Sequence, residues 1–209
     1  MNLDKSHSTD SQHDGEHKQE CRMAQEYLNL QKSCVDKDIY VIKCDAILTI
    51  DSCDKLVNFF ESHDAKEKFI WDQTNNVICD SINVVDDEKF KKKFNGVILD
   101  IIVGIIKTLR CFTHYTCQGY ECLLLRKIYG PTKLHCDGLG TLLNRNLSVI
   151  VSLNSDYHEG HIYFPKQDVK IRLDKGEILV FPPYWTHPHR VFSPVDDTYR
   201  YTLNFWLTE

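Results

Sequence analysis

The C-terminal half of the chain predicts a series of short β-strands, and this pattern constrains the fold more than any other feature. The segments are rich in β-branched and aromatic residues and are separated by turn signals such as Asp174-Lys-Gly176 and Pro182-Pro183. They cover residues 120–129, 147–153, 162–164, 169–173, 177–181, 186–191 and 199–207. Many short strands in succession are typical of a β-sandwich or barrel.

Two helices are predicted before these strands, following a first strand at residues 39–44. Asp51 is expected to cap a helix with an apolar stripe that includes Leu56 and Phe60. A second apolar stripe keeps helical spacing from about residue 86 to 110 and indicates a core helix. Residues 63–85 show no clean period, and we expect a functional or mobile loop there. Helices followed by a run of strands indicate the α+β class.

Length and charge restrict the remaining possibilities. The 209 residues are enough for one domain with a real core, and we place it at residues 38–209. Residues 1–37 are expected to be a polar, disordered or loosely attached tail with a short helix over 23–37. A net charge of −5 does not favour a nucleic-acid surface. No membrane-length apolar run or export signal is visible, and the nine cysteines lack a C-x-x-C pair, so we expect reduced thiols and a cytoplasmic location.

The residues with the clearest chemical meaning are His135 and Asp137. On an extended segment, side chains two residues apart point to the same face. Joined by a second histidine from another strand, they would form the 2-His-1-carboxylate triad of non-haem Fe(II) oxygenases. His187 and His189 are both candidates for the third ligand, because the two share a face of the predicted strand at residues 186–191. A single His-x-Asp also occurs by chance on protein surfaces, so the order of the other motifs decides.

Four motifs in a fixed order make the chain from about Asp38 onward resemble Fe(II)/2-oxoglutarate-dependent dioxygenases of the prolyl 4-hydroxylase type. They are Tyr129-Gly-Pro-Thr-Lys-Leu-His135-Cys-Asp137-Gly138, then Leu147–Asn154 with Glu159-Gly160 and Phe164-Pro165, then Lys175-Gly176 to Phe181-Pro182, and finally His189 to Pro194-Val195 with Arg200-Tyr201 and Trp206. The resemblance implies a double-stranded β-helix, or jelly-roll, with supporting helices packed on one sheet. It favours His189 over His187 as the third ligand.

The resemblance also implies the cofactors Fe(II), 2-oxoglutarate and O2, with ascorbate to sustain the ferrous state. Arg200 is expected to bind the far carboxylate of 2-oxoglutarate, because its planar fork suits a carboxylate. This requires Arg200 to lie near His189, which pairing of residues 186–191 with 199–207 would achieve. Arg200, Thr202, Asn204 and Trp206 would share one face of their strand. The alternative is that Arg200 makes a rim salt bridge.

Three further features of the motifs bear on the site. Tyr129 is expected either to hydrogen-bond 2-oxoglutarate or to be a core tyrosine, since it lies nearer His135 than in many family members. The distance from His189 to Arg200 is one residue longer than the usual family spacing, which a β-bulge would absorb. Cys136 is expected to point away from the iron, and His158 and His161 to be surface or turn residues rather than a second metal site.

The resemblance suggests hydroxylation of a peptidyl proline, with a protein or peptide as partner. Within enzymes, the alternative acceptor is a small molecule, a free amino acid or a nucleobase, although the acidic charge weighs against nucleic acid. From another class, the same fold would serve as a non-catalytic binding module, which the complete set of His135, Asp137, His189 and Arg200 disfavours. The step from fold to acceptor is by analogy.

Overall fold

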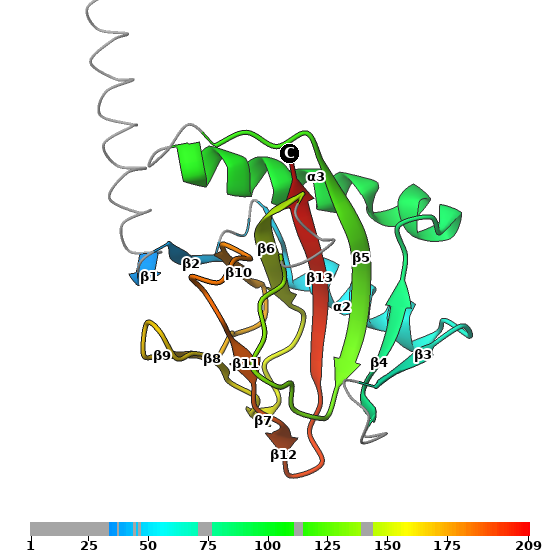
Figure 1. The fold of residues 1–209 in the computed structure, drawn as a ribbon. Helices are drawn as coiled ribbons and strands as arrows, with labels where there is room; N and C mark the ends of the chain where they lie inside the picture. The colour runs from blue at the N-terminus through cyan, green and yellow to red at the C-terminus, as the bar shows by residue number, and fades with distance from the viewer. Residues whose placement is uncertain are drawn as a thin grey trace, which may run out of the picture.

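An eight-stranded antiparallel sheet forms the centre of the protein (Figure 1). The computed structural model describes residues 34–36, 38–43, 45, 47–70, 77–110, 115–138 and 144–209. In order across the sheet the strands are β1 (Cys34–Asp36), β2 (Ile39–Lys43), β10 (Glu177–Phe181), β6 (Arg145–Ser152), β13 (Arg200–Thr208), β5 (Gly119–Ile128), β4 (Val77–Asn83) and β3 (Glu67–Ile70).

Two small sheets complete the β-structure. One has the order β11 (Arg190–Val191), β8 (Ile162–Phe164) and β9 (Val169–Ile171). The other pairs β12 (Pro194–Val195) with β7 (His158–Glu159). The strands therefore form two layers without closing into a barrel, in agreement with the predicted α+β class and jelly-roll architecture.

Two helices, α2 (Ile50–Glu61) and α3 (Glu88–Arg110), cover one face of the large sheet, as predicted (Figure 1). Their buried stripes include Leu56, Phe60, Phe94 and Ile98 and pack in one cluster with apolar residues of the central strands. The N-cap of α2 is Thr49 rather than the predicted Asp51. The Thr49 hydroxyl accepts a hydrogen bond from the Ser52 N–H at 3.1 Å, and Asp51 lies in the first turn, where a carboxylate also suits the helix dipole.

The opposite face of the large sheet meets the three-stranded sheet. Ile150, Leu179 and Phe181 of the large sheet pack in a second cluster with Ile162 and Phe164. Strand alternation divides β13 between the two faces, as predicted: Leu203, Phe205 and Leu207 join the helix-side cluster, whereas Arg200, Asn204 and Trp206 line a pocket on the other side. The polar face of β13 thus points between the sheets.

Two predicted elements and one predicted strand pairing are wrong. Residues 63–85 are not one long loop, because they contain β3 and β4, which pair as antiparallel edge strands; residues 71–76 lie outside the described residues. Of the predicted strand at 186–191, only β11 forms, because His187 lies in a turn closed by its N–H on the Tyr184 carbonyl and Pro188 has no N–H to give a ladder. β11 pairs with β8, and β13 pairs with β5 and β6 instead.

The N-terminal predictions are largely outside the described residues. Within the predicted helix at 23–37, residues Cys34–Asp36 form the strand β1, which pairs with β2. The large sheet therefore begins before residue 38. The described cysteines Cys53, Cys79, Cys117, Cys122 and Cys136 are free thiols. No helix in the described ranges is long and apolar enough to cross a membrane.

Beside the site, the chain passes close to the backbone of β4 at Gly130. The N–H groups of Tyr129 and Gly130 both donate to the Ile78 carbonyl, at 3.0 and 2.9 Å. A Cβ at Gly130 would lie 2.9 Å from the Ile78 Cα, a backbone atom that cannot move aside cheaply. The glycine therefore allows β4 to support the segment that leads from β5 to His135.

We predict that Gly130→Ala lowers the free energy of unfolding by about 1–3 kcal/mol, because the added methyl group overpacks this contact. Urea denaturation monitored by circular dichroism measures the change. Gly96→Ala is the matched control: Gly96 lies in α3 with no atom within 4 Å of its Cβ position, and alanine there should raise stability by about 0.5–1 kcal/mol. Equal effects of the two substitutions would contradict the role given to Gly130.

Candidate metal centre and adjoining pocket

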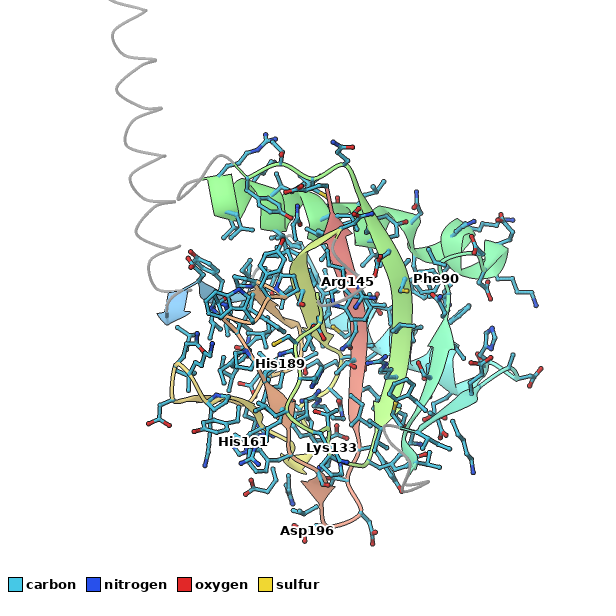
Figure 2. All side chains as sticks on the ribbon, in the orientation of Figure 1. Phe90, Lys133, Arg145, His161, His189 and Asp196 are labelled. Carbon is cyan, nitrogen blue, oxygen red and sulfur yellow. The ribbon has the colours of Figure 1, made fainter. Side chains whose placement is uncertain are left out.

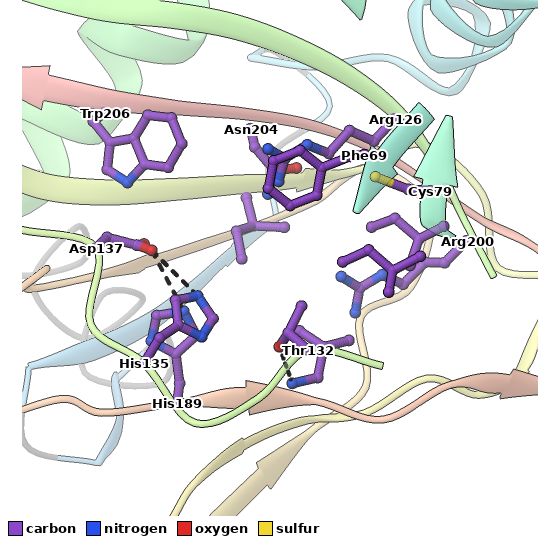
Figure 3. A pocket seen from close by; sticks show the side chains of 14 residues that line it. Phe69, Cys79, Arg126, Thr132, His135, Asp137, His189, Arg200, Asn204 and Trp206 are labelled. Atoms are coloured by element: carbon purple, nitrogen blue, oxygen red, sulfur yellow. Dashed lines mark hydrogen bonds and ion pairs between the residues drawn. The ribbon is translucent and has the colours of Figure 1, made fainter. Parts of the chain in front are cut away.

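His135, Asp137 and His189 converge on one point between the two sheets. Their ligand atoms all lie within 4.8 Å of one another. Asp137 Oδ1 is 3.5 Å from His135 Nε2 and 3.8 Å from His189 Nε2 (Figure 3). Two imidazole nitrogens and one carboxylate oxygen at this spacing can bind one metal ion from a single side. The structure therefore brings together the three residues singled out in the sequence.

A backbone bridge fixes the two histidines side by side. The His135 N–H donates to the His189 carbonyl at 3.0 Å, and the His189 N–H donates to the His135 carbonyl at 2.9 Å. The ring centroids are 4.3 Å apart. Because backbone groups make this bridge, the relative position of the rings depends on the chain path and not on flexible side chains.

Hydrogen bonds to carbonyls orient both imidazoles. His135 Nδ1 lies 2.8 Å from the Lys133 carbonyl, and His189 Nδ1 lies 3.2 Å from the His187 carbonyl. A carbonyl can only accept, so each Nδ1 carries the proton and each Nε2 offers a lone pair. Burial lowers the pKa of His189 to about 4, which keeps this imidazole neutral at neutral pH. Metal-binding histidines in proteins are held in this way.

Asp137 is held by β6. Its Oδ2 accepts a hydrogen bond from the Ser148 hydroxyl at 2.6 Å, and its backbone carbonyl accepts one from Arg145 Nη1 at 2.9 Å. Arg145 in turn stacks on the Trp206 ring at 3.6 Å and pairs with Glu121. Burial opposes ionisation of Asp137, but the contacts with His135, His189 and Ser148 outweigh it and hold the pKa of the carboxyl well below its usual range. Asp137 is thus an anion with Oδ1 directed at the histidines.

His187 lies outside this group. It is buried, but it sits in the turn before β11, and its Nδ1 contacts the Thr186 hydroxyl at 2.9 Å. It does not share a strand face with His189, contrary to the expectation from alternation. Among the described residues, His135, Asp137 and His189 form the one group with metal-ligand spacing.

The predicted surface histidines also lie apart from the centre. His158 pairs with Asp196 at 2.9 Å, and His161 pairs with Glu159 at 3.1 Å. Figure 2 shows His161 and Asp196 toward the outer edge of the protein, whereas His189 lies in its interior. Cys136 is neither in the group of ligand atoms nor in the pocket lining.

A pocket extends from the metal centre along the inner face of the large sheet. Figure 3 shows the three ligand residues at one end and Arg200 at the other. Arg200 is 2% exposed, its Nη1 donates to the Gly160 carbonyl at 2.8 Å, and its buried Nε has no partner among the described residues. Between the ends the wall is apolar, with Ile128, Ile150 and Val191. Arg200 reaches the pocket from a different sheet than His189, so the predicted direct pairing of their strands is not needed.

Tyr129 does not line this pocket. Its hydroxyl donates to Asp80 Oδ1 at 3.2 Å, and burial together with Asp80 raises the pKa of Tyr129 to about 12.

The connection between His189 and Arg200 contains a tight turn in which Asp196 and Asp197 both have positive φ. A β-bulge was predicted between His189 and Arg200. The short ladder of β12 with β7, which lies in this segment, shows no register shift and so contains no bulge.

Three functional neighbours were not predicted from the sequence. Ser148 and Arg145 hold Asp137, and Arg126 lines the pocket beside Arg200. The signal for Arg126 was its place directly after three leucines, in Leu123-Leu-Leu-Arg126. A charged side chain on the buried face of a strand needs a partner.

The donor set fits ferrous iron. A facial triad of two histidines and one carboxylate with open positions on the opposite side is diagnostic of non-haem Fe(II) oxygenases. Here the three residues line one end of the pocket, and Arg200, whose Nε–H has no partner among the described residues, lies at the other end. An anionic molecule in this pocket would lie among residues that include Arg200 and the three candidate ligands.

Comparison with known proteins bears on the family and the fold. The model of the 2OG-Fe(II) oxygenase superfamily matches residues 125–208. The predicted resemblance is confirmed. The matched region contains His135, Asp137, His189 and Arg200, the residues singled out in the sequence.

One curated relative carries a related name. A protein named "Putative prolyl 4-hydroxylase" from Acanthamoeba polyphaga mimivirus is 32% identical over 72 residues, which are 31% of this chain and 30% of that protein. The match therefore spans less than a third of the length of the curated relative.

Solved structures resemble nearly the whole chain. One is a prolyl hydroxylase from Trichoplax adhaerens in complex with a peptide fragment of the hypoxia inducible factor oxygen degradation domain. It superposes with a TM-score of 0.64 at 15% sequence identity, and the alignment covers 96% of this chain and 94% of the Trichoplax chain. The viral collagen prolyl hydroxylase of Paramecium Bursaria Chlorella virus-1, as its 2OG complex, gives a TM-score of 0.60 at 18% identity, covering 83% of this chain and 97% of its own. At these identities the likeness shows the fold.

We predict that His189→Ala abolishes iron binding and that His187→Ala leaves it intact. The first variant loses one of three ligands, so metal affinity should fall by more than the roughly 10–100-fold typical of losing an outer hydrogen-bond partner. Iron per chain, measured after reconstitution and desalting, tests this. Full iron content in the His189→Ala protein would contradict the assignment.

Ser148→Ala should weaken metal affinity by about 10–100-fold while the fold persists, because the Asp137 carboxylate loses the contact that orients Oδ1. The matched control is Ser152→Ala on the same strand, where the lost hydroxyl bonds the Asn154 carbonyl and lies away from the metal ligands. Competition with a metal-chelating dye gives the affinities. Equal affinities for the two variants would show that Ser148 does not position Asp137.

Proposed function

We propose that this protein is an Fe(II)- and 2-oxoglutarate-dependent dioxygenase that hydroxylates a prolyl residue in a peptide or protein. The observation that carries the proposal is the convergence of His135, Asp137 and His189 at one end of a pocket that Arg200 closes at the other. The match of residues 125–208 to the oxygenase superfamily supports it.

His135, Asp137 and His189 are the residues that would hold Fe(II). When bound, Fe(II) supplies the redox chemistry that couples oxidation of 2-oxoglutarate by O2 to hydroxylation of an acceptor. The chain contributes orientation: both Nδ1–H groups are tied to carbonyls, and Ser148 occupies one oxygen of Asp137. All three ligands therefore approach from one side and leave the pocket side for cosubstrate and O2.

Arg200 is the residue that would bind the far carboxylate of 2-oxoglutarate. A guanidinium that is buried without a carboxylate partner is costly, and a diacid supplies that partner. The side chains of Ile128, Ile150 and Val191 line the space between and exclude water from the carbon chain of the ligand. Water exclusion strengthens the contact between Arg200 and the carboxylate.

Two observations support a peptidyl proline as acceptor. The first is the prolyl hydroxylase name shared by the mimivirus relative and both structural neighbours, one of which is in complex with a peptide. The second is a set of exposed apolar side chains flanking the metal ligands. Leu134, directly before His135, is 56% exposed, and Trp185, four residues before His189, is 67% exposed. Exposed apolar groups this near the proposed ligands in sequence would suit a ring such as proline. The need for ascorbate and the cytoplasmic location stay predictions.

The proposal is tested by succinate release from 2-oxoglutarate in the presence of Fe(II), with prolyl peptides and with matched peptides in which alanine replaces proline. We expect succinate formation that the prolyl peptides stimulate, together with a peptide mass gain of one oxygen atom. His189→Ala serves as the inactive control. Turnover without a peptide preference would favour a small-molecule acceptor, and no turnover from iron-loaded protein would favour a binding module.

We predict that Arg200→Met raises the KM for 2-oxoglutarate by about 100-fold or more, because the loss of a buried partner for a charged group costs about 3–5 kcal/mol. Arg200→Lys should recover part of the loss, since it keeps the charge but not the fork. Arg110→Met, at the exposed end of α3, is the control and should leave KM unchanged. A wild-type KM in Arg200→Met would remove Arg200 from the cosubstrate site.

A further inference from the structure

The pocket wall carries more unsatisfied polar atoms than Arg200 alone accounts for. Buried atoms without a hydrogen-bond partner among the described residues include Arg200 Nε, Thr202 Oγ1, Asn204 Oδ1 and Trp206 Nε1 on β13, and Arg126 Nε on the neighbouring strand β5. Each such group costs about 1–3 kcal/mol if it stays unpaired. Arg126, Arg200, Asn204 and Trp206 all line the pocket, so a ligand there can supply the partners.

Arg126 is the second guanidinium of this pocket. No ion pair within 4.0 Å joins Arg126 or Arg200 to a carboxylate in the described part of the chain. The Phe69 ring stacks on Arg126, with 5.3 Å between the guanidinium carbon and the ring centroid, and covers one face of its plane. Burial lowers the pKa of both arginines, because desolvation disfavours a charged group. The pocket therefore presents two cations to one ligand.

The strand register places Arg126 between Arg200 and the metal centre. On β5, Ile128 is opposite Arg200, Arg126 is opposite Thr202, and Leu124 is opposite Asn204. Arg126 is thus two residues along the sheet from the level of Arg200, or about 7 Å, in the direction of Trp206.

The Trp206 end of β13 is the metal end. Trp206 is opposite Ser148, whose hydroxyl holds Asp137, and it stacks on Arg145, which holds the Asp137 carbonyl. The charge of Asp137 is among the causes of the pKa shift of Arg126. For Arg200, the charge of Arg126 is among the causes and that of Asp137 is not. Figure 3 shows the Arg126 side chain reaching toward Asn204, on the side of the pocket away from Thr132.

Charge balance determines what such a ligand must be. Asp137 is directed at the histidines, so it neutralises the metal rather than the arginines. Two guanidiniums, one at each level of the pocket, match a ligand with two anionic groups separated by a short carbon chain. A 2-oxo acid with a distal carboxylate has this form, and each of its carboxylates then meets an arginine.

We propose that Arg126 is a second cosubstrate-binding residue, which contacts the carboxylate of the 2-oxo acid group next to the metal while Arg200 holds the distal carboxylate. The inference rests on the proposed function, because it assigns a further contact to the same cosubstrate. It assigns Arg126 to ligand binding rather than to packing against Phe69 or to recognition of an acidic acceptor.

Two ligands that differ in the distal group distinguish the role of Arg126 from that of Arg200. The probes are 2-oxoglutarate and 2-oxovalerate, which keeps the 2-oxo acid group but has a methyl group in place of the distal carboxylate. Binding is measured by isothermal titration calorimetry on full-length protein loaded with Zn(II), so that no turnover occurs. The variants are Arg126→Met, Arg126→Lys and Arg200→Met, with Arg110→Met as the surface control. Bound metal and thermal unfolding are measured for each.

We expect Arg126→Met to weaken both ligands by a similar factor, of about 10–100-fold, since a hydrogen bond to a charged group is worth about 1.5–3 kcal/mol. Arg200→Met should weaken 2-oxoglutarate strongly and 2-oxovalerate little. Arg126→Lys should fall between the wild type and Arg126→Met for both ligands, because a charge remains without the fork. Metal content should not change.

Three outcomes would overturn the role of Arg126 and leave the proposed function standing. They are wild-type affinity of Arg126→Met for both ligands, a loss confined to 2-oxoglutarate, and unchanged 2-oxoglutarate affinity with a raised KM for the peptide. The last would assign Arg126 to the acceptor. Failure of the metal-loaded wild type to bind 2-oxoglutarate would instead contradict the proposed function itself. Should Arg126→Met fail to fold, Arg126→Lys, which keeps the cation over Phe69, decides by the same comparison.

Discussion

The two-way backbone bridge between His135 and His189 is the contact on which the site depends. It joins the segment after β5 to the start of β11, and it is the place where the two β-layers meet beside the metal ligands. The same bridge sets the separation of the His135 and His189 rings. It also positions Asp137, which follows His135 by two residues. Gly130 and its contact with Ile78 bring the chain to this bridge from one side, and the turn through His187 brings it from the other.

The second constraint is the alternation along β13. Its apolar residues fill the core under α2 and α3, and its polar residues form one wall of the pocket. One strand therefore serves stability with one face and, on the proposed function, ligand binding with the other. Several polar side-chain atoms of β13 have no partner among the described residues, and the strand remains in the centre of the sheet because β5 and β6 satisfy its backbone on both sides.

Part of this arrangement was predictable because it is local. The apolar stripes of α2 and α3, the alternation of β13 and the same-face relation of His135 and Asp137 all follow from the period of a helix or strand. The helix and strand positions near residues 50–61, 88–110 and 177–181 agree closely with the predictions. Local turn chemistry was harder to rank: Thr49, not Asp51, caps α2, although both residue types cap well.

The remainder depends on contacts between distant segments, which one sequence does not reveal. His187 and His189 look equivalent in the sequence, but the turn closed on Tyr184 removes His187 from the strand. β11 pairs with β8 and not with β13, so the nearness of His189 to Arg200 arises across two layers rather than along one ladder. Arg126 acquires its meaning in the same way. In sequence it is one charge near the end of an apolar strand, and the register with β13 places it between the metal end and Arg200. On the proposed function, a dianion and a divalent metal would balance the two guanidiniums and the three proposed ligands of this pocket, so the polar wall that weakens the empty fold would make the pocket selective for its ligands.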